Sequence, residues 1–234
     1  MWFASVSPDW LPIPAHAPGG PRLVAWGLGG LLVLGALAIN VRRTAAWAAL
    51  GLGALFAAGM LTLEAPYAVT HFKDWGGWQA VAESTVMALG GVLAYVRSPG
   101  AREAASLARA ARLVFGLCLL VFGVSHFVYV KLTASMVPAW LPPSQTVWAY
   151  LTGAAQIAAG VAMLSGVQAR LAAILLTAMY ALFSLLVHIP TLVAAPKSLD
   201  SWTENGINLV LTGAAWALAD TLTRRAKGKA AGKG

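Results

Sequence analysis

The sequence is poor in charged residues and in cysteine, and each shortage excludes a class of protein. Only 10% of the 234 residues are charged, whereas 59% are hydrophobic. A soluble domain carries roughly 25% charged residues, so there is too little polar surface here to coat a globule in water. The single cysteine, Cys118, excludes an internal disulfide and a thiol-pair mechanism. The composition therefore predicts an integral membrane protein.

Several motifs that would carry chemistry are also missing. The sequence has no Cys-x-x-Cys or His-x-x-x-His pair and no Gly-rich phosphate loop that follows a strand, so we predict no metal site. The net charge of +8 comes without a nucleic-acid-binding motif, and we expect no nucleic-acid partner. The first 20 residues lack the basic segment and apolar core of a secretory signal.

Long apolar runs are what the sequence has in abundance. A run of about 20 apolar residues is typical of a helix that crosses a lipid bilayer. The predicted fold class is therefore all-α, a polytopic membrane helix bundle with about seven transmembrane helices. The alternative is that two of the segments are re-entrant or lie at the interface. The seven segments are 22–40, 44–63, 78–96, 111–130, 145–164, 169–189 and 203–220.

The distribution of Lys and Arg predicts the orientation in the cell (inner) membrane. Loops on the cytoplasmic side carry an excess of these residues. Four fall on the predicted outer side: Arg22, Lys73, Lys131 and Lys197. The other twelve fall on the opposite side, which places the N-terminus outside and the C-terminus in the cytoplasm. These twelve are Arg42, Arg43, Arg97, Arg102, Arg109, Arg112, Arg170, Arg224, Arg225, Lys227, Lys229 and Lys233.

The chain contains a weak internal repeat. Trp-Leu-Pro occurs at 10–12 and at 140–142, and further matches follow at a constant offset of 124, among them Pro66 with Pro190 and Trp78 with Trp202. The repeat predicts a 3+4 architecture in which two copies share one orientation. The alternative is chance similarity between apolar helices. The predicted parts are 1–96 (first repeat), 97–110 (basic cytoplasmic loop), 111–220 (four-helix unit) and 221–234 (basic cytoplasmic tail).

The second copy resembles the DoxX and DoxX-like family of four-helix membrane proteins. The resemblance covers about 111–220 and lies in "FGVSHFVYVKL", "MVPAWLP", "LLVHIP" and "WTENGINLVLTGAAWAL". The first half looks like a degenerate copy that lacks its first helix, and the seven segments depart from simple members of the family. The family takes its name from a membrane subunit of a thiosulfate:quinone oxidoreductase. The resemblance implies a link to quinone or sulfur redox metabolism, a quinone as ligand and a redox partner subunit.

Polar residues at membrane depth are candidates for function because they are costly there. We expect these residues to converge in one pocket that opens to the outer side, with the carboxylates pairing with the histidines. The pocket would suit a quinone headgroup or a small polar or sulfur-containing substrate. The alternative is that they cap helix ends or hold helices together. The candidates are Glu64, Glu83, His126, Lys131, His188, Glu204 and Asn205.

Three functions remain open from the sequence. The first is an accessory membrane protein of DoxX-like type, which binds a ligand and serves a redox partner without catalysis of its own. The second is a small-solute transporter, which the shortage of polar residues in the cytoplasmic half of the segments disfavours. The third is a membrane enzyme that acts at the outer face, such as a quinone-linked oxidoreductase subunit, with Glu83 or His126 as acid or base.

Overall fold

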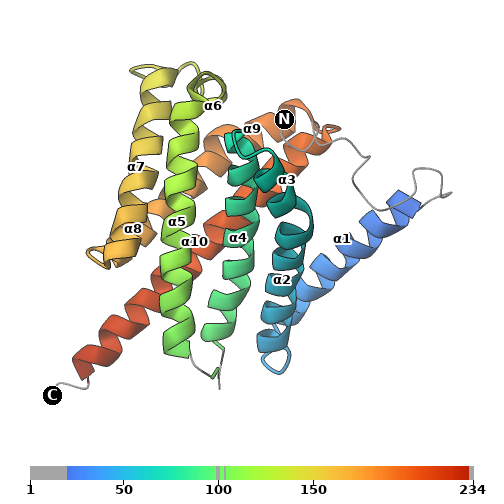
Figure 1. Ribbon diagram of the computed structural model, residues 1–234, viewed down its shortest axis with the longest axis vertical. Coiled ribbons are helices and arrows are strands. Elements are labelled where there is room, and N and C mark those ends of the chain that lie inside the picture. The colour runs from blue at the N-terminus through green and yellow to red at the C-terminus, as the bar shows by residue number, and fades with distance from the viewer. Residues whose placement is uncertain (1–19, 99–100, 103, 232–234) are drawn as a thin grey trace.

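The computed structural model describes residues 20–98, 101–102 and 104–231, and these residues form helices joined by loops, with no strand among them (Figure 1). Two short π-helical turns, η2 and η3, interrupt longer helices. The elements are α1 (Gly20–Ile39), α2 (Ala45–Gly59), η2 (Met60–Glu64), α3 (Ala65–Thr70), α4 (Trp75–Val96), α5 (Ala104–Val128), α6 (Val130–Met136), α7 (Gln145–Ser165), α8 (Ala169–Phe183), η3 (Ser184–His188), α9 (Ile189–Ala194) and α10 (Leu199–Ala231).

Five helical stretches are long and apolar enough to cross a membrane, which supports the predicted membrane class. They are Ala45–Thr70, Trp75–Val96, Ala104–Val128, Gln145–Ser165 and Ala169–Ala194. The first and last predicted segments are helical as well. However, the apolar helix Gly27–Ile39 is shorter, and α10 carries Asn205, Asn208 and Asp220. Seven membrane crossings therefore stay a prediction.

The helices of the two halves begin and end at matching positions. The succession α2, η2 and α3 spans 45–59, 60–64 and 65–70, and the succession α8, η3 and α9 spans 169–183, 184–188 and 189–194. Each bound in the first succession is 124 lower than the corresponding bound in the second. The starts of α4 at Trp75 and of α10 at Leu199 differ by the same number. This is the offset at which the sequence repeats.

A proline explains the irregular turn in each half. Pro66 and Pro190 stand at the second residue of α3 and of α9. Proline has no N–H to donate, and its ring clashes with the carbonyl four residues earlier. The helix absorbs the disruption by widening for one turn, and such π-helical turns occur often at functional sites. Glu64 and His188 are the last residues of the two widened turns.

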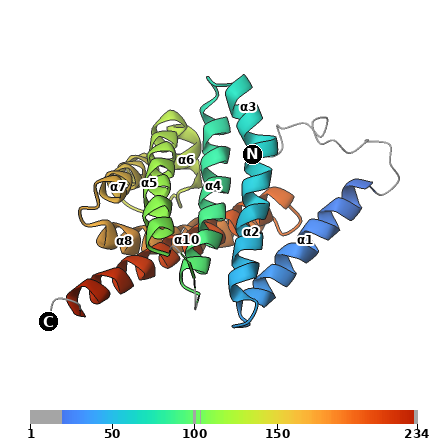
Figure 2. The ribbon, with the colours of Figure 1, turned by 60° about the horizontal axis from the view of Figure 1, so that its bottom comes forward.

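Close backbone contact holds the helices together. A methyl group on Gly123 of α5 would lie 2.7 Å from the Gly153 oxygen of α7, and one on Gly91 of α4 would lie 2.4 Å from the Ala49 oxygen of α2. Small residues of this kind let helices approach closely in lipid. By contrast, α1 packs mainly on α2 and leans away from the other helices (Figures 1 and 2).

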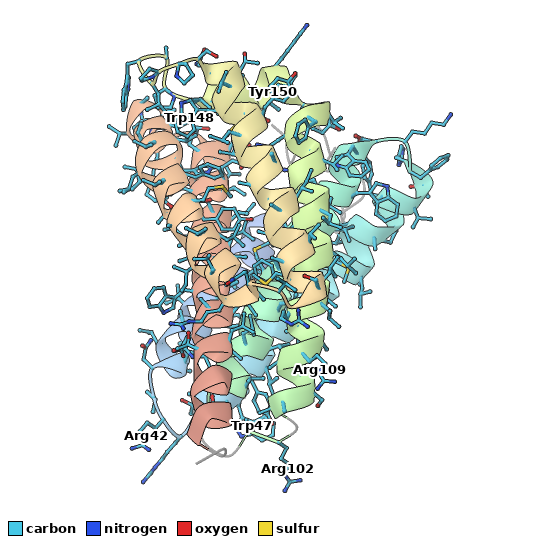
Figure 3. The ribbon with its side chains drawn as sticks, turned by 90° about the vertical axis from the view of Figure 1, so that its left-hand side faces the viewer. Arg42, Trp47, Arg102, Arg109, Trp148 and Tyr150 are labelled. Carbon is cyan, nitrogen blue, oxygen red and sulfur yellow. The ribbon has the colours of Figure 1, made fainter. Side chains whose placement is uncertain are left out.

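The two ends of the bundle differ in charge. Arg42, Arg102 and Arg109 lie at one end together with Trp47, which we call the basic end, and Trp148 and Tyr150 lie near the other (Figure 3). The short helices α3, α6 and α9 mark this second end, which we call the α6 end (Figure 1). The second Trp-Leu-Pro lies in the loop between α6 and α7, where Trp140 is exposed. The first, at 10–12, lies outside the described residues.

Asp74 ties three elements together at the α6 end. Its carboxylate caps α4 by accepting a hydrogen bond from the Gly76 amide at 3.2 Å. It also accepts hydrogen bonds from the hydroxyls of Tyr67, in α3, and of Tyr129, after α5, at 3.1 and 3.2 Å. Burial and the Asp74 carboxylate raise the pKa of Tyr129 above its ordinary value, so this hydroxyl stays a donor at neutral pH. The network fixes the start of α4, the helix that carries the candidate residue Glu83.

Candidate functional site

Three carboxyl groups gather inside the α6 half of the bundle. Glu64 comes from the η2 turn, Glu83 from the third turn of α4 and Glu204 from the second turn of α10. Glu83 interacts electrostatically with both of the other carboxylates. All three side chains are at least partly buried by protein alone. We call Glu64, Glu83 and Glu204 the acidic cluster.

Neighbouring polar side chains orient two of these carboxyls. The Ser84 hydroxyl donates to Glu64 Oε1 at 2.8 Å, and Gln79 Nε2 donates to Glu83 Oε1 at 3.0 Å. The other oxygen of Glu64, Oε2, is buried and has no hydrogen-bond partner among the described residues. Burying a polar atom without a partner costs about 1–3 kcal/mol. One edge of the cluster is therefore open to a further donor.

Tyr180 and Asn205 bring two more unsatisfied oxygens into this region. The side chain of Tyr180 is 3% exposed, and its hydroxyl interacts electrostatically with Glu83 but has no hydrogen-bond partner among the described residues. Asn205 follows Glu204, is 9% exposed, and likewise leaves its Oδ1 without a partner in the described part of the chain. Nearby, Asn208 Nδ2 donates to the Tyr180 carbonyl at 2.9 Å and to Ser184 Oγ at 2.7 Å. These bonds fix α10 against α8.

His126 lies on the seam between α5 and α7. Its Nε2 is 2.9 Å from Gln156 Nε2, which can only donate, so Nε2 accepts. The Thr152 hydroxyl already donates to the Trp148 carbonyl, so the His126 Nδ1–H donates to Thr152 Oγ1 at 3.0 Å and to the Ala149 carbonyl at 3.2 Å. The network thus assigns a neutral imidazole with its proton on Nδ1. Both ring nitrogens are engaged by α7.

A chain of aromatic rings joins this seam to the acidic cluster. The His126 ring stacks against Phe183 with 6.4 Å between centroids, and Phe183 lies 6.1 Å from the ring of Tyr180. Gln156 is 2% exposed, and its Oε1 is the fourth buried oxygen that lacks a partner among the described residues. The rings of Phe183 and Tyr180 therefore stand between His126 and the acidic cluster, which share no contact among the described residues.

The structure brings some of the predicted site residues together and separates others. Glu83 interacts electrostatically with Glu64 and Glu204, and Asn205 follows Glu204 in α10. The side chain of His188 is partly buried at the end of η3, and its imidazole ring makes no hydrogen bond to any described residue. Lys131 is exposed on α6. None of the expected ion pairs between a glutamate and a histidine forms among the described residues. The ion pair found there joins Arg97 to Asp220 at 3.0 Å.

Five polar residues of this region were not predicted from the sequence: Gln79, Ser84, Gln156, Tyr180 and Ser184. The repeat contained a signal for Ser84, because it stands at the position that matches Asn208. Gln156 is a long polar side chain in the middle of an apolar segment, the kind of residue that is costly in lipid and calls for a partner. No sequence pattern marks Tyr180, because a tyrosine inside a membrane helix also serves as ordinary packing.

Other hollows on the molecule have a different character. A groove of about 290 Å³ between α7 and α8 is lined by Ala and Leu residues with Gln168 at one end. A second groove, of about 620 Å³, lies between α1 and α2 and is also apolar. Neither includes a residue of the acidic cluster. Among the described residues, no group of His, Cys, Asp and Glu is arranged to hold a metal ion.

Comparison with known proteins gives one match. A family model described as a domain of unknown function, DUF8561, matches residues 115–219. The match begins inside α5 and ends inside α10, within the four-helix unit delimited from the sequence at 111–220. No curated protein and no solved structure matches the chain. The likeness to the DoxX family thus stays a prediction from the sequence.

Proposed function

We propose that the chain is a DoxX-like inner-membrane protein that binds a small polar ligand in its acidic cluster, from the outer side of the membrane. One observation carries the proposal. Glu83 interacts electrostatically with Glu64 and Glu204 within the bundle, and buried oxygens of Glu64, Tyr180 and Asn205 lack partners among the described residues. Apolar side chains at these places would make a more stable bundle. Their presence favours a ligand that satisfies them.

The orientation is part of the proposal. Arg42, Arg102 and Arg109 gather at the basic end (Figure 3), and such residues face the cytoplasm. The acidic cluster lies toward the α6 end and would then face outward, with the C-terminus in the cytoplasm. In the same proposal, residues 22–96 and 146–220 are parallel copies that make a 3+4 bundle. The common offset of 124 between helix bounds supports it.

The DoxX resemblance supplies the physiological context. We propose that the protein is an accessory to quinone-linked or sulfur redox metabolism, with the bound ligand either a quinone headgroup or a small polar substrate. The carboxylates of the cluster repel anions, which disfavours a sulfur oxyanion in this pocket. A transport route is disfavoured too, because the recorded buried side chains at the basic end of the bundle are mostly apolar, among them Leu93, Phe115 and Met163.

Native mass spectrometry of the protein in mild detergent tests the proposal. The expected spectrum shows a bound small molecule that is lost from Glu83→Gln and retained by Tyr150→Phe, which changes an exposed side chain of α7. Both variants should keep the thermal stability of the ligand-free protein. If Glu83→Gln retains the bound mass but unfolds at a much lower temperature, Glu83 is a structural residue and the proposal is wrong.

A further inference from the structure

The two apolar grooves are built from matching positions. All nine residues that line the groove between α7 and α8 have a counterpart, 124 positions lower, that lines the groove between α1 and α2. Ala159 matches Gly35 in this way, and Gln168 matches Thr44. Helix α1 therefore packs on α2 as α7 packs on α8. The faces of α1 and α7 that point away from the grooves can then be compared residue by residue.

The face of α7 that is turned toward α5 is closely covered. An added methyl group on Gly153 or Gly160 would lie 3.1 or 2.8 Å from a backbone oxygen of α5. The matching residues of α1 are Gly29 and Ala36, and both are exposed. A methyl group on Gly29 would meet nothing within 4 Å. The surface that holds α5 on α7 is therefore present on α1 but uncovered.

Helix α4 also holds α5, and its counterpart α10 shows the same contrast. Trp75 Nε1 of α4 donates to Ser125 Oγ of α5 at 2.9 Å, and Ala82, on the same face of α4, is 3% exposed. The matching residues of α10 are Leu199, which is 79% exposed, and Gly206, where a methyl group would meet nothing within 4 Å. Both surfaces that hold α5 thus have uncovered counterparts, one on α1 and one on α10.

The uncovered surfaces suit a helix better than lipid chains. Small residues stand seven positions apart on each of them, Gly29 with Ala36 on α1 and Gly206 with Gly213 on α10. Glycine inside a helix costs about 1 kcal/mol relative to alanine, and contact with lipid does not offset this cost. Small residues do let another helix approach closely, as the matching glycines of α7 show with α5.

We infer that the protein forms a two-fold dimer in which the α1 helices of two copies pack against each other and beside α10 of the partner copy. The uncovered face belongs to α1 itself, which packs mainly on α2 and leans away from the other helices (Figures 1 and 2). A two-fold axis along the membrane normal therefore covers this face in both copies at once. No charged residue stands between Gly27 and Ile39, so the two faces do not repel. The two α1 helices run parallel, an arrangement that small residues support.

Disulfide cross-linking in native membranes tests the inference, in the full chain with Cys118→Ala. Ala36→Cys places the thiols of two copies within reach of each other, whereas Leu34→Cys lies exposed on the groove side of α1. We expect at least about fivefold more cross-linked dimer from Ala36→Cys than from Leu34→Cys after mild oxidation. Equal cross-linking of the two variants, or a cross-link from Ala36→Cys to a different protein, would overturn the inference.

The affinity of the dimer in detergent, measured by analytical ultracentrifugation, gives a second test. Gly29→Leu and Gly206→Leu fill open space in the single chain, so each should keep its Tm while the Kd of the dimer rises about tenfold. Gly51→Leu also fills open space but lies in the groove between α1 and α2, and it should leave the Kd unchanged. If the unmodified chain stays monomeric, or Gly29→Leu dimerises as tightly as Gly51→Leu, the inference is wrong. If Gly29→Leu lowers the Tm, the cross-linking result decides. Neither test depends on the ligand of the acidic cluster.

Discussion

The two halves of the molecule hold corresponding helices together by different means. In the first half, α2 and α4 approach through Gly53 and Gly91, where an added methyl group would lie under 3 Å from backbone atoms of the other helix. The matching positions of the second half are Thr177 and Ala215. There, Asn208 of α10 instead donates hydrogen bonds to Tyr180 and Ser184. The same helix order thus tolerates two kinds of contact.

The same comparison separates scaffold from candidate site. Positions that set the scaffold agree between the halves, such as Pro66 with Pro190 and Trp78 with Trp202. Positions at the acidic cluster do not agree, because Glu83 matches Ile207 and Glu204 matches Ala80. The three carboxyls of the acidic cluster therefore come from both halves, two from the first and one from the second.

The largest expected effect comes from the glycine contact of the first half. In Gly91→Ala, the new methyl group would lie 2.4 Å from the Ala49 oxygen and 2.7 Å from Gly53, so the helices must separate. We expect a loss of about 3 kcal/mol in the free energy of unfolding, measured by denaturant titration in detergent. Gly51→Ala is the control, because a methyl group there meets nothing within 4 Å. Equal stability of the two variants would contradict close packing between α2 and α4.

The caps of α4 and α10 should differ in strength. Asp74 caps α4 and also binds Tyr67 and Tyr129, whereas Ser198, at the matching position of the second half, accepts from the Ser201 amide alone at 3.3 Å. We expect Asp74→Ala to cost about 2–3 kcal/mol and Ser198→Ala about 1 kcal/mol. The same denaturant titration measures both. A smaller loss for Asp74→Ala than for Ser198→Ala would show that the tyrosine contacts do not stabilise the fold.

The polar contacts between the helices of each half should have intermediate effects. Ser84→Ala removes the recorded hydrogen bond of Glu64 and leaves both carboxyl oxygens unsatisfied, so we expect a loss of about 1–2 kcal/mol. Ser184→Ala should cost less, about 0.5–1 kcal/mol, since Asn208 keeps its bond to the Tyr180 carbonyl. If the Ser84→Ala variant is as stable as the unmodified protein, water donates hydrogen bonds to the Glu64 carboxyl in place of Ser84.

The smallest effects should be equal in the two halves. Trp78 Nε1 donates to the Phe72 carbonyl at 3.1 Å, and Trp202 Nε1 donates to the Pro196 carbonyl at 3.0 Å. Both pairs match at the offset of 124. Trp78→Phe and Trp202→Phe should each cost about 0.5–1 kcal/mol. Thermal unfolding of both variants side by side checks this, and a difference above 1 kcal/mol would argue against equivalent environments.

Periodic features of the fold were predictable from the sequence. The offset of 124 matched Pro66 with Pro190, and each predicted apolar segment coincides with a helix, although several bounds differ, as at the start of α5 and the end of α10. The π-helical turns themselves were not predicted. The short helices α3, α6 and α9 were not predicted. Each follows a break in a long helix and lacks an apolar period of its own. Local contacts accompany two of them, because Tyr67 of α3 and Tyr129, just before α6, both donate to Asp74.

The candidate site was predictable only in part. The cost of a carboxyl in lipid identified Glu64, Glu83 and Glu204, and Glu83 interacts electrostatically with the other two. That they form one pocket stays a prediction. The sequence could not show that the ring nitrogens of His126 form hydrogen bonds with Thr152 and Gln156, because these bonds depend on which face of α7 meets α5. Nor could it place Lys131, which lies in a helix after α5, on the surface of the molecule.

The central claim is that the acidic cluster opens to the outer side of the membrane. Position 83 can be tested directly in a chain that carries Cys118→Ala, since Cys118 is the single native cysteine. In Glu83→Cys, a membrane-impermeant maleimide added to sealed vesicles of known orientation reports which side reaches the cluster. We expect labelling from the outer face and none from the cytoplasmic face. Labelling from the cytoplasmic face alone, or labelling only after the protein is unfolded, would contradict an outward-facing site.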